Sequence, residues 1–443
     1  MSAAPTPPVP RPLHRTVWRW HFYAGLFCVP FVLWLASTGS IYLFKPQIEA
    51  WIDRPLDRLT FDGPLAAPSA QVQAALATVP GAGFSAYELP QGPASAARVL
   101  LRAADGTTIR AYVDPGRLTV LKTIAEEDRL LPTIARLHGK LGIGDPGSYV
   151  VELAASWAIV MIVTGLYLWW PRDGSGPAGV LWPRFTRRGR PLWRDLHAVI
   201  GFWASAFALF LLITGLPWTA FWGSNLRALR SYAAQADVRQ DWTTRAAATT
   251  GHEGHGAAVA ALGYDAAVLD RLLPVVAAAA LAPPVLITAP SAKSPHWLAK
   301  SDSANRPQRV TLTFDGETGQ VLKREGFDGK PLFDRIISTG IAAHEGQLFG
   351  LANQLLGLFT ALSLIGLCIS AVVMWLKRRP PAVLGAPTAI KAARVPVALI
   401  VAAVTLALLL PMFGLSLIAV LIVERVLLRR LPRTREFLGL AAP

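Results

Sequence analysis

Residues 19–39 read RWHFYAGLFCVPFVLWLASTG, and this stretch decides the class of protein to which the chain is assigned. No charged residue occurs from Phe22 to Phe44, and a helix of this length crosses the hydrocarbon core of a bilayer. The chain is 53% hydrophobic and only 16% charged, and further apolar runs fill residues 149–171, 197–222, 351–376 and 395–423. We therefore predict a multi-pass membrane protein in contact with lipid, whose first run is a full-length span rather than a cleavable signal.

The net charge of +15 is distributed unevenly along the chain. The two longest polar segments, 45–148 and 223–350, are nearly neutral, with 11 Lys/Arg against 11 Asp/Glu and 13 against 12. The other polar segments are short and together hold 19 basic and 4 acidic residues; they are 1–21, 172–196, 377–394 and 424–443. Because basic residues stay on the cytoplasmic side, we predict a bacterial inner-membrane protein with a cytoplasmic N-terminus and two periplasmic segments. The excess charge therefore gives no support for nucleic-acid binding.

The apolar and basic segments together predict the domain organisation. Transmembrane helices are expected at 22–44, 149–171, 197–222 and 351–376. The cytoplasmic parts are expected to be the tails 1–21 and 424–443 and the basic loops 172–196 and 377–394. The last apolar run, 395–423, carries Pro411 in its middle, and we predict a hairpin of two short helices, because a hairpin keeps the Arg-rich tail inside. One tilted helix is the alternative.

An internal repeat relates the two halves of the chain. The first span of each copy has a histidine, a glycine four positions later and a Thr-Gly pair 17 positions later: His21, Gly25, Thr38 and Gly39, then His197, Gly201, Thr214 and Gly215. The second span of each copy follows a histidine, with a hydroxyl residue 26 positions later and a tryptophan 31 positions later: His138, Thr164 and Trp169, then His344, Ser370 and Trp375. The chain is therefore predicted to be two copies of span, outer domain and span.

Each outer segment ends with a strand-turn-strand pattern. TIRAYVDPGRLTVLKT (108–123) and RVTLTFDGETGQVLKRE (309–325) alternate on both sides of Asp-Pro-Gly and Asp-Gly turns, and residues 69–78 have a helical pattern. The only cysteines, Cys28 and Cys368, lie in spans, so we expect each outer domain to bury a core of its own. The predicted fold class is a membrane all-α bundle, four core helices in two repeats plus a C-terminal hydrophobic hairpin, with two outer α+β domains.

The four repeat-related histidines form the candidate site. The predicted topology places His21 and His197 at the cytoplasmic ends of two spans, and His138 and His344 at the outer ends of the other two. A haem that is not covalently attached needs one imidazole on each side of its iron and apolar walls, which facing helices supply. The chain has no C-x-x-C-H motif, so we predict two b-type haems with these histidines as axial ligands. Gly25 and Gly201 are expected to make room for the macrocycle.

Other interpretations of these histidines explain the sequence less well. Zinc would need a third or fourth ligand, and a proton relay would need more ionisable groups in the spans than Glu152. Four unrelated interfacial histidines would not explain the spacings that match between the repeats. Arginines near the inner pair are candidates for the haem propionates, or follow the positive-inside bias; they are Arg15, Arg19 and Arg194. Three other histidines stay open: His252 and His255 as H-x-x-H metal ligands or a loop, and His296, beside Trp297 and near Lys293 and Lys300, as an anion or aromatic site or a surface cluster.

The chain resembles a known family in two motifs. The turns VDPGRLTVL and FDGETGQVL resemble PepSY modules, and the His-led spans ending in TGLYLWWPR resemble the PepSY-associated transmembrane family, over roughly residues 12–380. Within that family the arrangement is most similar to the inner-membrane siderophore reductases of the ferrioxamine type. The resemblance implies PepSY-like outer domains, two b-type haems and reduction of a ferric siderophore outside the cytoplasmic membrane.

These observations predict a haem-dependent oxidoreductase that passes electrons to the periplasmic face and releases iron as Fe(II) for uptake. No side chain is assigned a catalytic role other than iron ligation. The short cytoplasmic loops contain no dinucleotide fingerprint, so the electron donor is expected to be a quinol or a cytoplasmic reductase. Two alternatives remain: a non-enzymatic PepSY protein that binds a peptidase, which leaves the matched histidines unexplained, and a siderophore or metal transporter, for which mid-membrane polar residues are missing.

Overall fold

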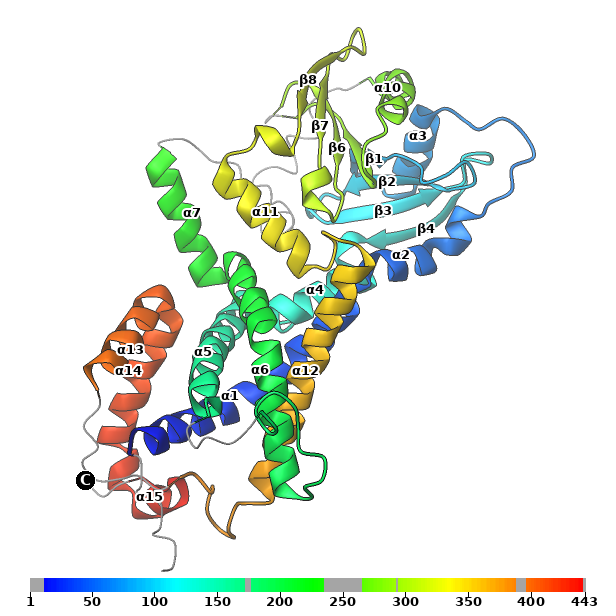
Figure 1. Cartoon of the computed structure of the whole chain (residues 1–443). Coiled ribbons are helices and arrows are strands. Elements are labelled where there is room, and N and C mark those ends of the chain that lie inside the picture. The colour runs from blue at the N-terminus through cyan, green and yellow to red at the C-terminus, as the bar shows by residue number, and fades with distance from the viewer. Residues whose placement is uncertain (1–11, 172–176, 235–264, 292–293, 388–395, 441–443) are drawn as a thin grey trace, which may run out of the picture. The chain divides into compact units, whose positions relative to one another are not determined.

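The computed structural model describes residues 12–171, 177–234, 265–291, 294–387 and 396–440 (Figure 1). The chain divides into two compact units, each built from segments that are distant in the sequence. The helical unit comprises Met1–Ser40, Arg136–Val238 and Leu356–Pro443, and the sheet unit comprises Ile41–Ala135 and Arg239–Leu355.

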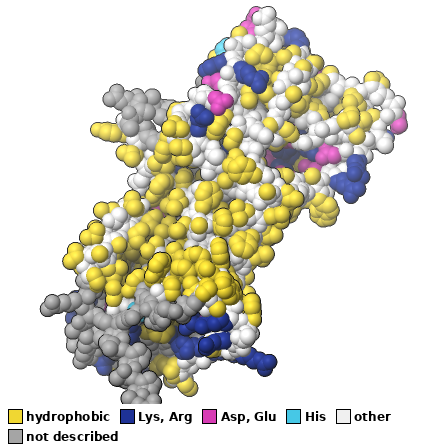
Figure 2. Space-filling view, in the orientation of Figure 1, with side chains coloured by type: hydrophobic (Ala, Val, Ile, Leu, Met, Phe, Trp, Pro, Cys, Tyr) yellow, Lys and Arg dark blue, Asp and Glu magenta, His cyan; other side chains and the backbone are white. Residues whose placement is uncertain are grey.

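Helices of different lengths, several of them long and apolar, make up most of the helical unit. They are α1 (Pro12–Leu43), α5 (Asp145–Trp169), α6 (Arg190–Gly215), α7 (Ala220–Ala234), α12 (Leu351–Leu376), α13 (Val397–Leu409), α14 (Pro411–Val426) and α15 (Pro432–Leu438). Within the described ranges, five are long and apolar enough to cross a membrane: α1, α5, α6, α12 and α14, the last with its following turn. Figure 2 shows hydrophobic side chains over much of the surface of these helices. Such a surface is stable only in a lipid environment, so the chain is a membrane protein.

The last apolar run consists of two helices that contact each other, α13 and α14. Leu410 separates them with an extended backbone (φ −124°, ψ 77°), and Pro411 begins α14, because proline has no N–H to continue α13. Phe413 packs edge-on against Trp157 of α5, with ring centroids 4.9 Å apart. One continuous tilted helix is therefore absent from residues 397–426. Which side of the membrane each end faces stays a prediction.

The buried carboxylate of Glu152 in α5 caps another helix. It accepts hydrogen bonds from the backbone N–H groups of Phe221 (3.0 Å) and Trp222 (3.1 Å), and Ser148 accepts one from Ala220 (3.0 Å). These N–H groups belong to the first turn of α7, where a helix has no internal acceptors and carries partial positive charge. Glu152 therefore has a structural role in holding α7 against α5.

The described residues of the sheet unit form one antiparallel sheet of eight strands in the order β4-β3-β2-β1-β5-β6-β7-β8. The strands are β1 (Gly83–Glu88), β2 (Ala97–Arg102), β3 (Thr108–Val113), β4 (Val120–Ala125), β5 (Val285–Thr288), β6 (Trp297–Ser301), β7 (Thr311–Phe314) and β8 (Val321–Glu325). The helices are α2 (Lys45–Asp53), α3 (Pro68–Thr78), α4 (Leu130–Lys140, whose last turns belong to the helical unit), α10 (Ala267–Ala278) and α11 (Leu332–His344).

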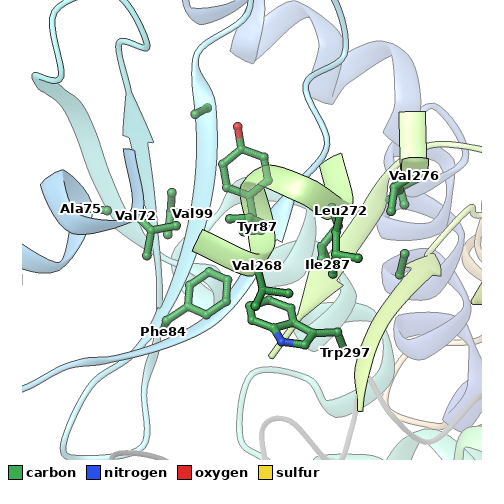
Figure 3. Packing of buried hydrophobic residues seen from close by; sticks show 14 of the residues in the cluster. Val72, Ala75, Phe84, Tyr87, Val99, Val268, Leu272, Val276, Ile287 and Trp297 are labelled. Atoms are coloured by element: carbon green, nitrogen blue, oxygen red, sulfur yellow. The ribbon is translucent and has the colours of Figure 1, made fainter. Parts of the chain in front are cut away.

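The expectation of two outer domains with separate cores is wrong. Strands β1 and β5 pair directly, with Tyr87 opposite Ile287, so the two segments share one sheet. Helices α3 and α10 pack on the same face, where Val72, Phe84, Val268 and Trp297 belong to one buried cluster, as Figure 3 shows. The physical reason is the edge of a four-stranded sheet: β1 would leave its backbone N–H and C=O groups without partners, and pairing with β5 satisfies them while enlarging the core.

Candidate functional site

Two of the four predicted histidines lie close together inside the helical unit. His21 of α1 and His197 of α6 have ring centroids 6.5 Å apart, and their ring planes are inclined by 84°. The two residues are 176 positions apart in the chain, and they occupy equivalent positions in the two repeats. The structure therefore brings together the pair that the repeat predicted.

A hydroxyl group of α5 fixes the ring of His21. Thr164 Oγ1 lies 3.0 Å from His21 Nδ1 and 2.9 Å from the carbonyl oxygen of Val160 in its own helix. The carbonyl can only accept, so the hydroxyl donates to Val160 and its oxygen accepts the N–H of His21. This network assigns the proton to Nδ1 and leaves the Nε2 lone pair of His21 available for a metal.

The ring of His197 is fixed in the same way by α12. Its Nδ1 lies 3.0 Å from Ser370 Oγ and 3.2 Å from the carbonyl oxygen of Leu367. Since Leu367 can only accept, His197 Nδ1 must carry the proton, and Nε2 is again the free nitrogen. Thr164 and Ser370 occupy equivalent repeat positions, so each histidine is held by its own copy of the same arrangement.

The geometry of this pair fits a haem. Imidazole–metal bonds of about 2 Å place the ring centroids of two axial ligands roughly 6 Å apart on either side of one metal, close to the separation found here. A histidine that ligates a metal is usually oriented by a hydrogen bond from its other ring nitrogen. No group of three or more His, Cys, Asp or Glu suited to a metal ion occurs among the described residues, so the pair has no third ligand of the kind zinc would need.

Glycines beside the hydroxyl residues accommodate the histidine rings. A Cβ atom on Gly165 would lie 3.2 Å from His21 Cε1, which is tighter than ordinary contact. The glycines singled out from the sequence lie elsewhere: a Cβ on Gly25 would meet Met161 at 3.6 Å, and one on Gly201 would meet Leu367 at 3.5 Å. In the structure, Gly25 and Gly201 are helix-contact positions, while Gly165 is the residue that the ring approaches. A Thr-Gly pair in the spans was the signal that could have identified it.

Of the two histidines predicted to lie at the outer side, His138 makes contacts like those of His21 and His197. His138 Nδ1 lies 3.0 Å from Thr38 Oγ1, which is also 2.8 Å from the carbonyl oxygen of Trp34, so the same donor argument applies. A Cβ on Gly39 would lie 3.2 Å from His138 Cε1, which repeats the Thr-Gly arrangement. His138 belongs to the helical unit and His344, the last residue of α11, to the sheet unit. Their pairing across one iron stays a prediction.

The arginines near the inner pair have partners of their own. Arg19 Nη1 donates to the carbonyl oxygens of Pro387 (2.8 Å) and Gly439 (2.7 Å), which fastens the end of α15 to α1. Arg194 Nη2 lies 3.3 Å from a carboxylate oxygen of Asp195, which is fully buried and also binds Arg184. A role for Arg15, Arg19 or Arg194 with haem propionates stays a prediction, and Arg19 is a structural residue in addition.

A buried ionic network, which the sequence did not predict, occupies the sheet face opposite α3 and α10. Arg98 and Arg110, on neighbouring strands, flank Glu88, with Arg110 Nη1 2.5 Å from its carboxylate and Arg98 Nε 3.8 Å away. Arg98 also donates to Asp57 (2.8 Å), and Arg110 pairs with Glu126. Burial alone would lower the pKa values of both guanidinium groups, but these carboxylates raise them above the ordinary value.

A small cavity of about 220 Å³ lies beside this network. Its lining residues come from α2, β3, β4 and the start of α4: Glu49, Ile52, Asp53, Tyr112, Lys122, Ile124, Arg129, Leu130 and Leu131. Burial raises the pKa of Tyr112 to about 12, partly opposed by Arg110, so its hydroxyl stays protonated and donates to Asp53 at 3.2 Å. Arg129 is 3.3 Å from both Glu49 and Glu126. The polar groups of the cavity wall are thus engaged with one another.

The remaining candidates from the sequence are less informative. His252, His255 and Lys293 lie outside the described residues. His296 is exposed, immediately before the buried Trp297 at the start of β6. Its charge contributes to the lowered pKa of Asp315, whose main cause is hydrogen bonding from the backbone N–H groups of Thr318 and Glu317. No described contact makes His296 part of the histidine site.

Comparison with known proteins agrees with the family suggested by the motifs. A family model described as PepSY-associated TM region matches residues 18–378, which include all four histidines. The chain belongs to this family, and the predicted membership is confirmed. No individual curated protein gives a significant match.

Proposed function

We propose that this member of the PepSY-associated transmembrane family is a di-haem reductase that carries single electrons across the bacterial inner membrane to a ferric siderophore. The observation that carries the proposal is the His21–His197 pair, with ring centroids 6.5 Å apart and both Nδ1 atoms engaged by neighbouring helices. Two b-type haems would supply one-electron transfer when bound. His21 and His197 would hold the inner one, and His138 and His344 the outer one.

The protein's own residues contribute ligation and a dry environment. His21 and His197 would present Nε2 to the iron, and the hydroxyls of Thr164 and Ser370 would keep the opposite nitrogens protonated. Apolar helix surfaces exclude water from the electron path, which limits loss of electrons to solvent. The reduction of the iron transfers an electron alone, so this step requires no side chain to act as an acid or a base.

The substrate reaction consumes one electron for each iron released. The donor, a quinol or a cytoplasmic reductase, loses one electron at the cytoplasmic side, and the chelated Fe(III) gains it at the outer side. A quinol would therefore serve two turnovers and release two protons. Fe(II) binds hard oxygen ligands less strongly than Fe(III), so the reduced iron dissociates from the siderophore without any bond being cleaved in the chelator.

The proposed orientation follows from the charge distribution. Basic residues concentrate in short segments such as 172–196 and 377–394, whereas 45–148 and 223–350 are nearly neutral. Single cysteines near residues 105 and 255 should therefore react with an impermeant thiol reagent added outside intact inner-membrane vesicles of periplasmic-side-out orientation. Cysteines near 180 and 385 should react only after permeabilisation. Outside labelling at 180 would overturn the orientation and the assignment of inner and outer histidines.

The decisive test is a redox spectrum of the purified full-length chain. Protein from haem-replete cells should bind about two b-type haems per chain, show the sharp α-band of six-coordinate haem after reduction, and become oxidised on addition of a ferric siderophore. A colourless protein would refute the proposal and would favour a peptidase-binding PepSY protein or a transporter. If the bound haem is not oxidised by any ferric chelate, the protein is an electron carrier whose substrate is not a ferric siderophore.

A further inference from the structure

The rings of His21 and His197 are almost perpendicular, at 84°, and each ring is anchored by a different pair of helices. We propose that Thr164 and Ser370 are positioning residues that set this perpendicular arrangement of the two axial imidazole planes. The inference rests on the proposed function, since it concerns how the inner histidine pair would hold a haem. It goes beyond that function by making these two residues, which would not touch the iron, responsible for the angle between the ring planes.

The ring of His21 is held along its Nδ1–Cε1 edge by α5. The Thr164 hydroxyl accepts from Nδ1, and its own proton is used by Val160, so the oxygen cannot turn away without losing a bond. Gly165 lies against the Cε1 edge of the same ring, where a Cβ atom would stand 3.2 Å away. The hydroxyl and the backbone thus meet the same Nδ1–Cε1 edge of the ring, and a rotation of the imidazole plane would break the hydrogen bond or press Cε1 against the helix.

The ring of His197 is held by α12 through two acceptors. Ser370 Oγ and the Leu367 carbonyl oxygen lie 3.0 and 3.2 Å from Nδ1, and the Ser370 hydroxyl itself donates to Leu367 at 2.9 Å. The three groups form a closed set of hydrogen bonds. Because His21 is anchored within one repeat and His197 within the other, the angle between the rings is fixed by the way the two repeats pack, not by contact between the rings.

The angle has a spectroscopic consequence for a low-spin ferric haem. Each axial imidazole donates π density into the iron d orbital perpendicular to its plane. Parallel planes raise one of the two dπ orbitals and separate them in energy, whereas perpendicular planes raise both and leave them nearly equal. An unpaired electron in a nearly degenerate pair produces one very large g component in the electron paramagnetic resonance spectrum, and well-separated orbitals produce three resolved components.

The experiment measures this spectrum in the oxidised full-length protein. A His138→Ala background removes the predicted outer haem, so that only the inner pair contributes, and the haem content is determined by pyridine haemochrome. We expect a single large g component. Thr164→Val and Ser370→Ala should each convert it into a three-component signal at unchanged haem content, because the freed ring rotates towards the plane of the other.

Two matched variants separate positioning from general damage. Thr164→Ser retains a hydroxyl at the same distance and should restore the large g component. Ser205→Ala, in α6, removes a hydroxyl whose described bond goes only to its own helix, at Gly201, and should leave the spectrum unchanged. If His138→Ala yields no folded protein, the same comparisons are made in the wild-type background, where Thr164→Val should remove one of the two ferric signals.

The outcomes distinguish this inference from the proposed function. Protein without haem refutes the proposed function. A haem-containing protein with unaltered Thr164 and Ser370 could instead give three resolved components for the inner haem. That result refutes the perpendicular arrangement and leaves the reductase proposal standing. A large g component that persists in both Thr164→Val and Ser370→Ala shows that these hydroxyls do not position the rings.

Discussion

The two halves of the sheet have the same strand order and register, but equivalent positions on one face are charged in the first half and neutral in the second. The strand registers make Glu88, Arg98 and Arg110 in the first half equivalent to Thr288, Leu298 and Thr311 in the second. The three charged residues are almost completely buried, at 5%, 3% and 6% exposure, and their neutral counterparts are half-buried. The ionic network thus lies on β1, β2 and β3, and the equivalent positions of β5, β6 and β7 carry none of its charges.

The ionic network of the first half attaches a helix to the sheet. In the first half, Arg98 binds Asp57 and Tyr112 binds Asp53, so the network fastens the end of α2 and the turn after it onto the strands. Helix α2 follows α1 after only one residue. In the histidine-bearing helices, by contrast, the two repeats agree. The contact between His21 and Thr164 in the first repeat has its equivalent in the contact between His197 and Ser370 in the second.

The largest effect should come from the helices in which the repeats agree. His21→Ala and His197→Ala should each lower the haem content from about two to about one per chain, because a haem with one axial ligand is bound weakly. The measurement is haem per chain by pyridine haemochrome, with His296→Ala in the sheet unit as the control that retains both. Unequal losses from the two alanine variants would break the equivalence of the repeats.

A smaller effect should distinguish the two halves of the sheet. Glu88→Gln leaves Arg98 and Arg110 buried with a neutral partner and should destabilise the first half by about 3 kcal/mol. Thr288→Val at the equivalent position should change it by about 0.5 kcal/mol or less. Hydrogen exchange of the amides of β1–β3 in the full-length protein measures both. Similar exchange in the two variants would show that the buried network does not stabilise the strands.

The ionic network should also make the first half sensitive to acid. Burial raises the pKa of Glu126, but Arg110 and Arg129 together lower it by more, so its pKa lies below the ordinary value of 4.5. A depressed carboxyl pKa contributes stability that is complete above 4.5 and is lost as the pH falls through the folded-state pKa. Amides of β3 should therefore lose protection on acidification below pH 4.5, more than those of β7. Glu126→Gln should lower protection at neutral pH and flatten this dependence; an unaltered pH profile would contradict it.

The smallest difference is expected at the edge strands. Lys122 of β4 lies over the Tyr112 ring, 5.8 Å from its centroid, and its register equivalent in β8 is Lys323, which forms an exposed pair with Glu325. Lys122→Ala should cost about 0.5 kcal/mol through the lost cation–π contact. Lys323→Ala should cost nothing measurable, because exposed pairs contribute little. Exchange of the β3 and β7 amides again provides the measurement, and a larger loss for Lys323→Ala would reverse the comparison.

Much of the helical unit could be predicted from the sequence. Uninterrupted apolar runs identify spans because lipid requires every backbone group to be paired within its own helix, so each span can be recognised from its own residues. The repeat then related His21 to His197 and Thr164 to Ser370 by spacing alone. The proximity of His21 and His197 was predicted in this way. The hydrogen bonds that orient their rings were not, because a spacing does not reveal which helices lie adjacent.

The sequence by itself determined that the chain enters the membrane and consists of two related halves. Only the tertiary structure decided that β1–β4 and β5–β8 form one sheet, that Glu152 caps α7, and that charged Glu88, Arg98 and Arg110 are buried together. Hydropathy and spacing report on each segment alone. Strand pairing, helix capping and buried ion pairs are satisfied by partners far away in the chain, and a charged residue in a strand has the same local pattern whether it meets water or an opposite charge.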